Sequence, residues 1–245
     1  MYDDPDLFDA LLPASGEQRS FYVALAQRQA GSVLELACGS GQLLVPVAGT
    51  GLACVGLDSS PQMLDGARRR ASAAGAHVDL IDGDMRDFDL GRRFSLVLVA
   101  RNSLLHLSEL EDFARLFQAV GRHLEPDGVL AFDIYNPSIP ALARPTGERF
   151  DVMRVLATPY GELTVEATND YDPASQVNRA TWFISSATQR DAWTSQLHMR
   201  SIFPQELLSL LAANGFRLIR RDGDYAGSAF TGTSPRQVCQ CRPIA

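Results

Sequence analysis

Lysine is missing from this sequence of 245 residues, so all 22 basic side chains are arginines. Without a lysine amine, the chain cannot form an internal Schiff base, anchor pyridoxal phosphate or supply the lysine of a P-loop. Cysteine is scarce too, with only Cys38, Cys54, Cys239 and Cys241. No pair has CxxC spacing, and a chain this long with so few cysteines does not need a disulfide framework. We therefore expect reduced thiols and a cytoplasmic protein.

Long apolar runs and an excess of positive charge are also lacking. Stretches such as residues 94–100 are far too short to cross a bilayer, and the acidic N-terminal segment does not have the regions of a signal peptide. The formal net charge of −7 disfavours nucleic acid or an anionic membrane as a partner. The four histidines show no metal-ligand spacing, so no metal site is predicted.

The composition, 46% hydrophobic and 21% charged, favours a packed core over disorder. Short apolar runs alternate with helical patterns between residues 31 and 134, which is typical of a parallel sheet with crossover helices. The expected strands lie at residues 32–36, 52–57, 77–81, 94–100 and 129–134. Helices are expected from Ser60 to Ala74 and from about residue 109 to 124.

After Pro145 the pattern changes to one that predicts antiparallel strands with one wet face, at residues 163–168, 177–185 and 193–200. A helix over residues 204–214 and two last strands, 216–220 and 237–242, complete the chain. The fold class is therefore α/β. We expect one doubly wound domain that carries an antiparallel insertion.

The first βα turn contains Gly39 and Gly41, where the absence of a Cβ lets a ligand approach the backbone. Tight turns need glycine as well, so the pair alone is ambiguous. Asp58 ends the next strand, where its carboxylate can accept hydrogen bonds from both hydroxyls of a ribose. Asp84 and Met85 follow the third strand and could bind an adenine amine and pack on its ring. Leu44 occupies the place of the third small residue of the nicotinamide fingerprint, which disfavours a nicotinamide oxidoreductase.

Taken together, these strand ends resemble the class I S-adenosylmethionine (SAM)-dependent methyltransferases. Glu35-x-Ala37-x-Gly39-x-Gly41 is similar to their first motif, with Ala37 in place of the commoner glycine. The resemblance implies a Rossmann-like, mainly parallel sheet of seven strands with an antiparallel last strand. It also implies SAM as cofactor, with S-adenosylhomocysteine as product, bound by Tyr22, Glu35, Ala37, Gly39, Gly41, Asp58, Ser59, Met63, Asp84, Met85 and Ala100.

The resemblance covers the whole chain and divides it into a helical lid (1–30), a SAM-binding core (31–145), the insertion (146–201) and a C-terminal part (202–245). Within the superfamily the sequence is most similar to bacterial small-molecule enzymes, including amino-sugar N-methyltransferases. The segments that carry this likeness are residues 2–11, the stretch 83–88 and the insertion.

Methyl transfer needs positioned reactants, and it needs a base only when the acceptor carries a proton. His106 is the candidate base, or else a histidine that binds backbone at a helix start; Asn102 either orients the acceptor or caps a turn. Tyr2, Tyr225 and Phe230 are candidates for the substrate wall, although packing and a solvated loop are alternatives. Arg200 could hold a substrate carboxylate, but an ion pair within the insertion is favoured.

We therefore predict methyl transfer from SAM to a small molecule, with an amine acceptor placed ahead of a hydroxyl on resemblance alone. A SAM-binding regulatory protein without an acceptor is the alternative that is not an enzyme. The insertion could cover the acceptor pocket, form a homodimer interface, or do both.

Overall fold

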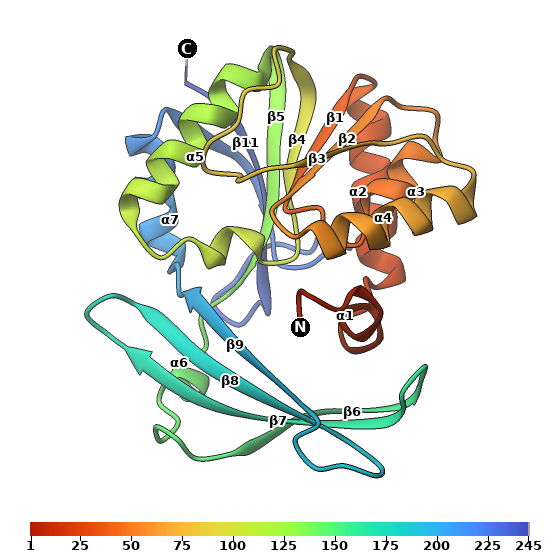
Figure 1. Cartoon of the computed structure of the whole chain (residues 1–245). Helices are drawn as coiled ribbons and strands as arrows, with labels where there is room; N and C mark the ends of the chain where they lie inside the picture. The colour runs from red at the N-terminus through yellow and green to blue at the C-terminus, as the bar shows by residue number, and fades with distance from the viewer. Residues whose placement is uncertain (245) are drawn as a thin grey trace.

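The computed structural model describes residues 1–244 and contains two β-sheets, the smaller lying below the larger in Figure 1. Seven strands form the larger sheet, in the spatial order β10 (Phe216–Asp222), β11 (Arg236–Pro243), β5 (Leu124–Tyr135), β4 (Phe94–Val99), β1 (Val33–Leu36), β2 (Cys54–Asp58) and β3 (Asp79–Asp82). Strand β11 runs antiparallel to both of its neighbours, β10 and β5, while β1 to β5 pair in parallel. The predicted Rossmann-like sheet with an antiparallel last strand is confirmed.

Helices cover both faces of this sheet, because its strands are apolar on both sides. One face packs against α2 (Gly16–Gln29), α3 (Leu44–Ala48) and α4 (Pro61–Ala74), and the other against α5 (Leu110–His123) and α7 (Pro204–Ala213). Helix α4 begins and ends as the sequence predicts: the Ser60 hydroxyl accepts a hydrogen bond from the Met63 amide at 3.2 Å, and Gly75 closes it with a φ of 61°.

The insertion forms a four-stranded antiparallel sheet of β6 (Phe150–Thr158), β7 (Gly161–Asp172), β8 (Val177–Ser186) and β9 (Trp193–Arg200), in chain order. The sequence predicted only the last three strands. Strand β6 was missed because it is an edge strand that pairs with β7 alone and lacks a strict alternation of buried and exposed residues. Three short helical segments complete the structure: α1 (Pro5–Leu11), η1 (Ser103–His106) and α6 (Ile139–Leu142).

The N-terminal helix α1 lies beside the space between the two sheets in Figure 1. Its Leu7 and Leu11 are buried against Leu163, Val165 and Ile184 of the insertion. This contact brings the insertion and the N-terminus together at the carboxyl ends of the parallel strands, where α/β sheets bind ligands. Within residues 1–244, no helix is long and apolar enough to cross a membrane.

Candidate active site

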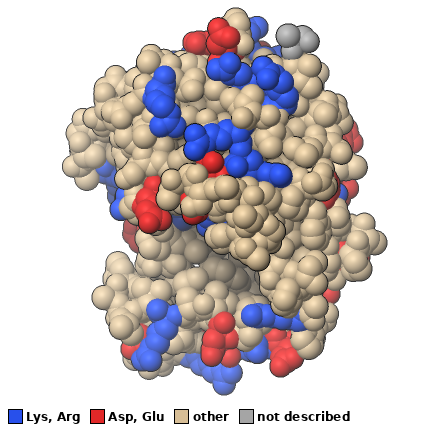
Figure 2. Space-filling model, turned by 180° about the vertical axis from the view of Figure 1, so that it is seen from behind, with Lys and Arg blue, Asp and Glu red and all other residues tan. Residues whose placement is uncertain are grey.

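A cavity of about 1300 Å³ lies between the carboxyl ends of the parallel strands and the inner face of the insertion. From behind, the molecule is visibly hollowed between its upper body and its lower sheet (Figure 2). The cavity reaches from Glu35 and Asp58 on the large sheet to Trp182 and Leu197 on the small one. Such a volume exceeds that of most single-ligand pockets, so two molecules can be held side by side.

Most of the predicted site residues line this one cavity. They are Tyr2, Glu35, Ala37, Gly39, Asp58, Ser59, Met63, Asp84, Met85, Ala100, Asn102, His106 and Arg200. Tyr22, Gly41, Tyr225 and Phe230 do not belong to its wall among the residues that the structure describes.

The two glycines of the first βα turn differ: a ligand can approach the backbone at Gly39, whereas a helix packs against Gly41. Gly39 has a φ of 54°, and a Cβ added there would meet no heavy atom within 4 Å. Gly41 also has a positive φ, but its added Cβ would lie 3.2 Å from the Ala67 side chain of α4. Gly41 therefore permits close packing of the turn against a helix, and its expected ligand contact stays a prediction.

The Asp58 carboxylate is held in place by backbone donors. Its Oδ2 accepts a hydrogen bond from the Gly39 amide at 2.7 Å and its Oδ1 one from the Ser60 amide at 2.9 Å. Burial raises the pKa of Asp58, while these two amides act in the opposite direction. Each carboxylate oxygen keeps a free lone pair, which suits a ligand with hydroxyl groups.

Two buried oxygen atoms on the cavity wall have no hydrogen-bond partner among the described residues: Oε2 of Glu35 and Oδ1 of Asn102. Burial raises the pKa of Glu35 to about 8. Unpaired buried acceptors are costly, and a ligand that donates to them removes the cost.

Asp84 lines the cavity, but its carboxylate is already engaged by a neighbour. The Arg86 guanidinium donates to both oxygens, at 3.0 Å from Nε to Oδ1 and 2.6 Å from Nη2 to Oδ2. This hydrogen bonding lowers the pKa of Asp84. The carboxylate is thus ionised and fixed in orientation, and Met85 follows it on the same wall.

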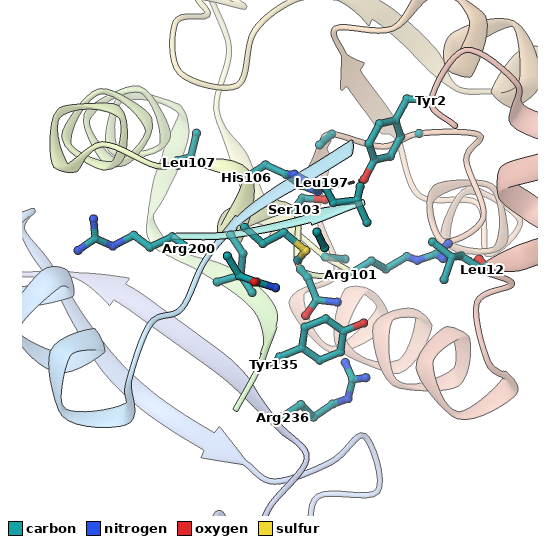
Figure 3. A pocket seen from close by; sticks show the side chains of 18 of the residues that line it. Tyr2, Leu12, Arg101, Ser103, His106, Leu107, Tyr135, Leu197, Arg200 and Arg236 are labelled. Atoms are coloured by element: carbon teal, nitrogen blue, oxygen red, sulfur yellow. Dashed lines mark hydrogen bonds between the residues drawn. The ribbon is translucent and has the colours of Figure 1, made fainter. Parts of the chain in front are cut away.

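Tyr2 and His106 meet across the cavity, as Figure 3 shows. The Tyr2 hydroxyl lies 3.1 Å from Nε2 of His106, and the two rings are arranged edge to face with centroids 5.8 Å apart. Burial raises the pKa of Tyr2 to about 12 and lowers the pKa of His106. At neutral pH the imidazole is therefore uncharged and able to accept a proton.

Tyr22 and Tyr225 form a buried network behind the cavity wall. The Tyr22 hydroxyl donates to Oδ1 of Asp133 at 2.6 Å, and the Tyr225 hydroxyl lies 2.7 Å from Nη1 of Arg236. Both rings also pack against Phe21. The expected contacts of Tyr22 with cofactor and of Tyr225 with substrate stay predictions, and neither residue lines the cavity among the described residues.

Phe230 and Arg200 are likewise committed to internal contacts. The Arg221 guanidinium lies over the Phe230 ring, 4.3 Å from its centroid, away from the cavity wall. Arg200 lines the cavity, but its Nη atoms donate to Ser108 and Gln176 and form an ion pair with Glu206 at 3.0 Å. Arg200 does form an ion pair, but its partner Glu206 belongs to α7 and not to the insertion as predicted, and Phe230 does not line the cavity among the described residues.

Sequence reasoning did not single out several residues of the wall. Arg101, Tyr135 and Arg236 lie on it near the strand ends, and Trp182 belongs to the inner face of the insertion. Arg101 directly precedes Asn102 in a loop after β4, so strand-end logic could have included it. Tyr135 at the end of β5 could have been included on the same ground, whereas nothing local marks Trp182.

Comparisons with known proteins agree with this geometry. Residues 33–128 match the family model of the methyltransferase domain. The chain is 28% identical over 204 residues to the cypemycin N-terminal methyltransferase of a Streptomyces species, covering 83% of this chain and 79% of that protein. It is 35% identical over 135 residues to the dTDP-3-amino-3,6-dideoxy-alpha-D-glucopyranose N,N-dimethyltransferase of Streptomyces fradiae, covering 52% of this chain and 51% of that enzyme. The structure of the CcbJ methyltransferase from Streptomyces caelestis superposes with a TM-score of 0.83 at 25% identity, over 100% of this chain and 98% of that one.

These matches identify a SAM-dependent methyltransferase domain at residues 33–128. The residues of this methyltransferase fit SAM, which is its cofactor. A cationic ligand beside the unpaired Oε2 of Glu35 would favour ionisation of this side chain, the clear space at Gly39 admits a close approach, and Asp58 suits a ribose.

Proposed function

We propose that this methyltransferase transfers the methyl group to an amine nitrogen of a small molecule. The observation that carries the proposal is one continuous cavity, which joins the SAM-binding strand ends to a second wall made by the insertion. The cypemycin enzyme and the amino-sugar enzyme both have amine acceptors by name, which supports nitrogen over oxygen.

In this proposal Glu35, Asp58 and Met63 hold SAM at one end of the cavity, with Asp84 and Met85 at the adenine. Ala37, Ser59 and Ala100 contribute to the same wall. When bound, SAM supplies a methyl group on a sulfonium, which an acceptor lone pair displaces in line. Trp182 and Leu197 of the insertion face the acceptor, and Asn102 orients it.

The acceptor nitrogen loses one proton as the new N–CH3 bond forms, and the pair of Tyr2 and His106 is positioned to receive it. The Tyr2 hydroxyl lies 3.1 Å from Nε2 of His106, so it can give its proton to the uncharged ring while it takes up the proton that leaves the acceptor nitrogen. Removing the imidazole should therefore slow methyl transfer without changing the affinity for SAM.

The test is an acceptor screen with SAM, using matched panels of small amines and of the same molecules with a hydroxyl in place of the amine. We expect the amines to gain the mass of one methyl group, and we expect H106A to methylate them about 100-fold more slowly. H77A is the control, because the His77 side chain is 97% exposed. Methylation of hydroxyls alone would mean an O-methyltransferase, and SAM binding with no product in either panel would favour a regulatory protein.

Two further proposals concern the setting of the protein. Its four cysteines are free and buried, which supports a reducing compartment such as the cytoplasm. The edge strand β6 exposes Leu156, at 69% of its surface, beside unpaired backbone, which supports a homodimer through the insertion. The elution volume of the purified protein, compared with that of an L156D variant, tests the dimer.

A further inference from the structure

A single buried side chain, Asp133 of β5, connects the core to the loop that follows β4. The carboxylate is fully buried and does not line the cavity among the residues described. Its Oδ1 accepts hydrogen bonds from the Tyr22 hydroxyl at 2.6 Å and the Arg101 amide at 2.9 Å. Its Oδ2 accepts one from Nη1 of Arg236 at 2.9 Å, and its backbone carbonyl accepts one from the Asn102 amide at 3.1 Å.

The loop held by Asp133 has an unfavourable backbone. Arg101 and Asn102 follow one another with φ values of 60° and 64°, both in the left-handed region. Asparagine tolerates this conformation, but arginine does so rarely, and two such residues in succession persist only where the surroundings impose them. Both amides of this turn are bound by Asp133, one by its side chain and one by its carbonyl.

The turn determines where the Asn102 side chain points. Its Oδ1 is buried on the cavity wall and has no partner among residues 1–244. A different backbone conformation at residues 101–102 would direct this oxygen elsewhere.

We propose that Asp133 is a positioning residue for catalysis, which acts by holding the strained turn so that the Asn102 amide faces the bound reactants. The kinetic part of this proposal rests on the function proposed above. The structural part stands without it, because it concerns the conformation of the turn.

The substitution D133N removes the charge and one hydrogen-bond acceptor of the side chain while keeping its volume. An asparagine amide places donor hydrogens where Asp133 now accepts from Tyr22, Arg101 or Arg236, so at least one donor is left facing another donor. The matched control is D222N, because Asp222 is also a buried strand acid paired with an arginine, at 2.7 Å from Nε of Arg220, and it is not on the cavity wall.

The first experiment is nuclear magnetic resonance of the 15N-labelled protein, which needs no acceptor. The Asn102 side-chain amide, assigned by its loss in N102A, should shift or broaden in D133N and stay unchanged in D222N. Unchanged Asn102 signals in D133N would overturn the proposal. Thermal unfolding checks that D133N is folded; if it is not, the comparison is made in an R101G background, since glycine adopts the left-handed turn freely.

The second experiment is a double-mutant cycle on methyl transfer, with S-adenosylhomocysteine affinity measured in parallel. We expect D133N alone to lower kcat about tenfold with little change in that affinity. Added to the N102A variant, D133N should lower kcat by less than about a further threefold. Independent, multiplicative losses would show that Asp133 does not act through Asn102. A wild-type protein that methylates nothing would contradict the proposed function, while the resonance experiment would still decide the role of Asp133.

Discussion

Glu35 and Asp58 lie at the ends of neighbouring parallel strands, and burial raises the pKa of both carboxyls. Asp58 receives two backbone hydrogen bonds, whereas one oxygen of Glu35 has no partner among the described residues. Burial is therefore offset less at Glu35 and raises its pKa to about 8, above the usual 4.5. Burying the Glu35 carboxyl without a ligand therefore destabilises the folded state.

This difference predicts how stability depends on pH. Between pH 4.5 and about 8 the folded protein keeps a proton on Glu35 that the unfolded chain has lost, so the stability contributed by this group falls as pH rises through that window. At about 1.4 kcal/mol per pKa unit, the loss amounts to a few kcal/mol. E35Q should therefore show a flatter dependence of Tm on pH than wild type between pH 5 and 8. Parallel profiles for the two proteins would count against a raised pKa.

Residues at strand ends could be predicted from sequence because parallel strands bring their carboxyl ends to one edge. Asp58 and Met85 followed from this placement, whereas Glu35 came from the resemblance to the first motif of the family. The aromatic residues could not be assigned in this way: Tyr22 and Tyr225 look like lid or wall residues until their hydroxyls are seen in contact with Gln18 or Asp133. The left-handed φ of Arg101 also leaves no mark in the sequence.

Among the elements, helix α1 is held to the core by a small polar cluster. Arg70 of α4 pairs with Asp9, and its Nε donates to the Ser40 carbonyl at 2.9 Å. At the other end of the helix, the Tyr160 hydroxyl donates to Asp4 at 2.9 Å. Because Ser40 belongs to the glycine turn, this cluster links the position of α1 to the SAM-binding edge.

Loss of this attachment should loosen α1 without unfolding the domain. We expect R70A to weaken S-adenosylhomocysteine binding about tenfold, as the loss of one charge-assisted contact allows, and to expose residues 1–15 to limited proteolysis. R68A is the control, because Arg68 forms an exposed pair with Asp65 on the same helix. Equal behaviour of the two variants would mean that α1 is held by its apolar contacts alone.

The central elements were predictable because buried parallel strands are short, apolar and separated by capped helices. The insertion was only partly predictable. Strands β7 to β9 alternate visibly, but β6 mixes Asp151 and Arg154 with apolar residues at a sheet edge, where partners on one side only weaken the pattern.

For the molecule as a whole, the two sheets perform different tasks around one cavity. The large sheet contributes the turn at Gly39 and the acids of β1 and β2, and the insertion contributes an aromatic and apolar wall. That division explains why the strand-end motifs identify the cofactor but leave the acceptor open: the acceptor wall comes from a segment without a local motif.

The most direct test of this account is a calorimetric titration of wild type, D58A and D82A with SAM, S-adenosylhomocysteine and NAD. Asp82 ends β3 beside Asp58 but lies outside the cavity wall of the described chain, which makes it the matched control. We predict that the wild-type protein binds both sulfur compounds but not NAD. This binding should be at least about tenfold weaker in D58A and unchanged in D82A. Wild-type protein that binds neither sulfur compound, or D58A that binds them normally, would contradict the assignment of the strand-end edge as the SAM site.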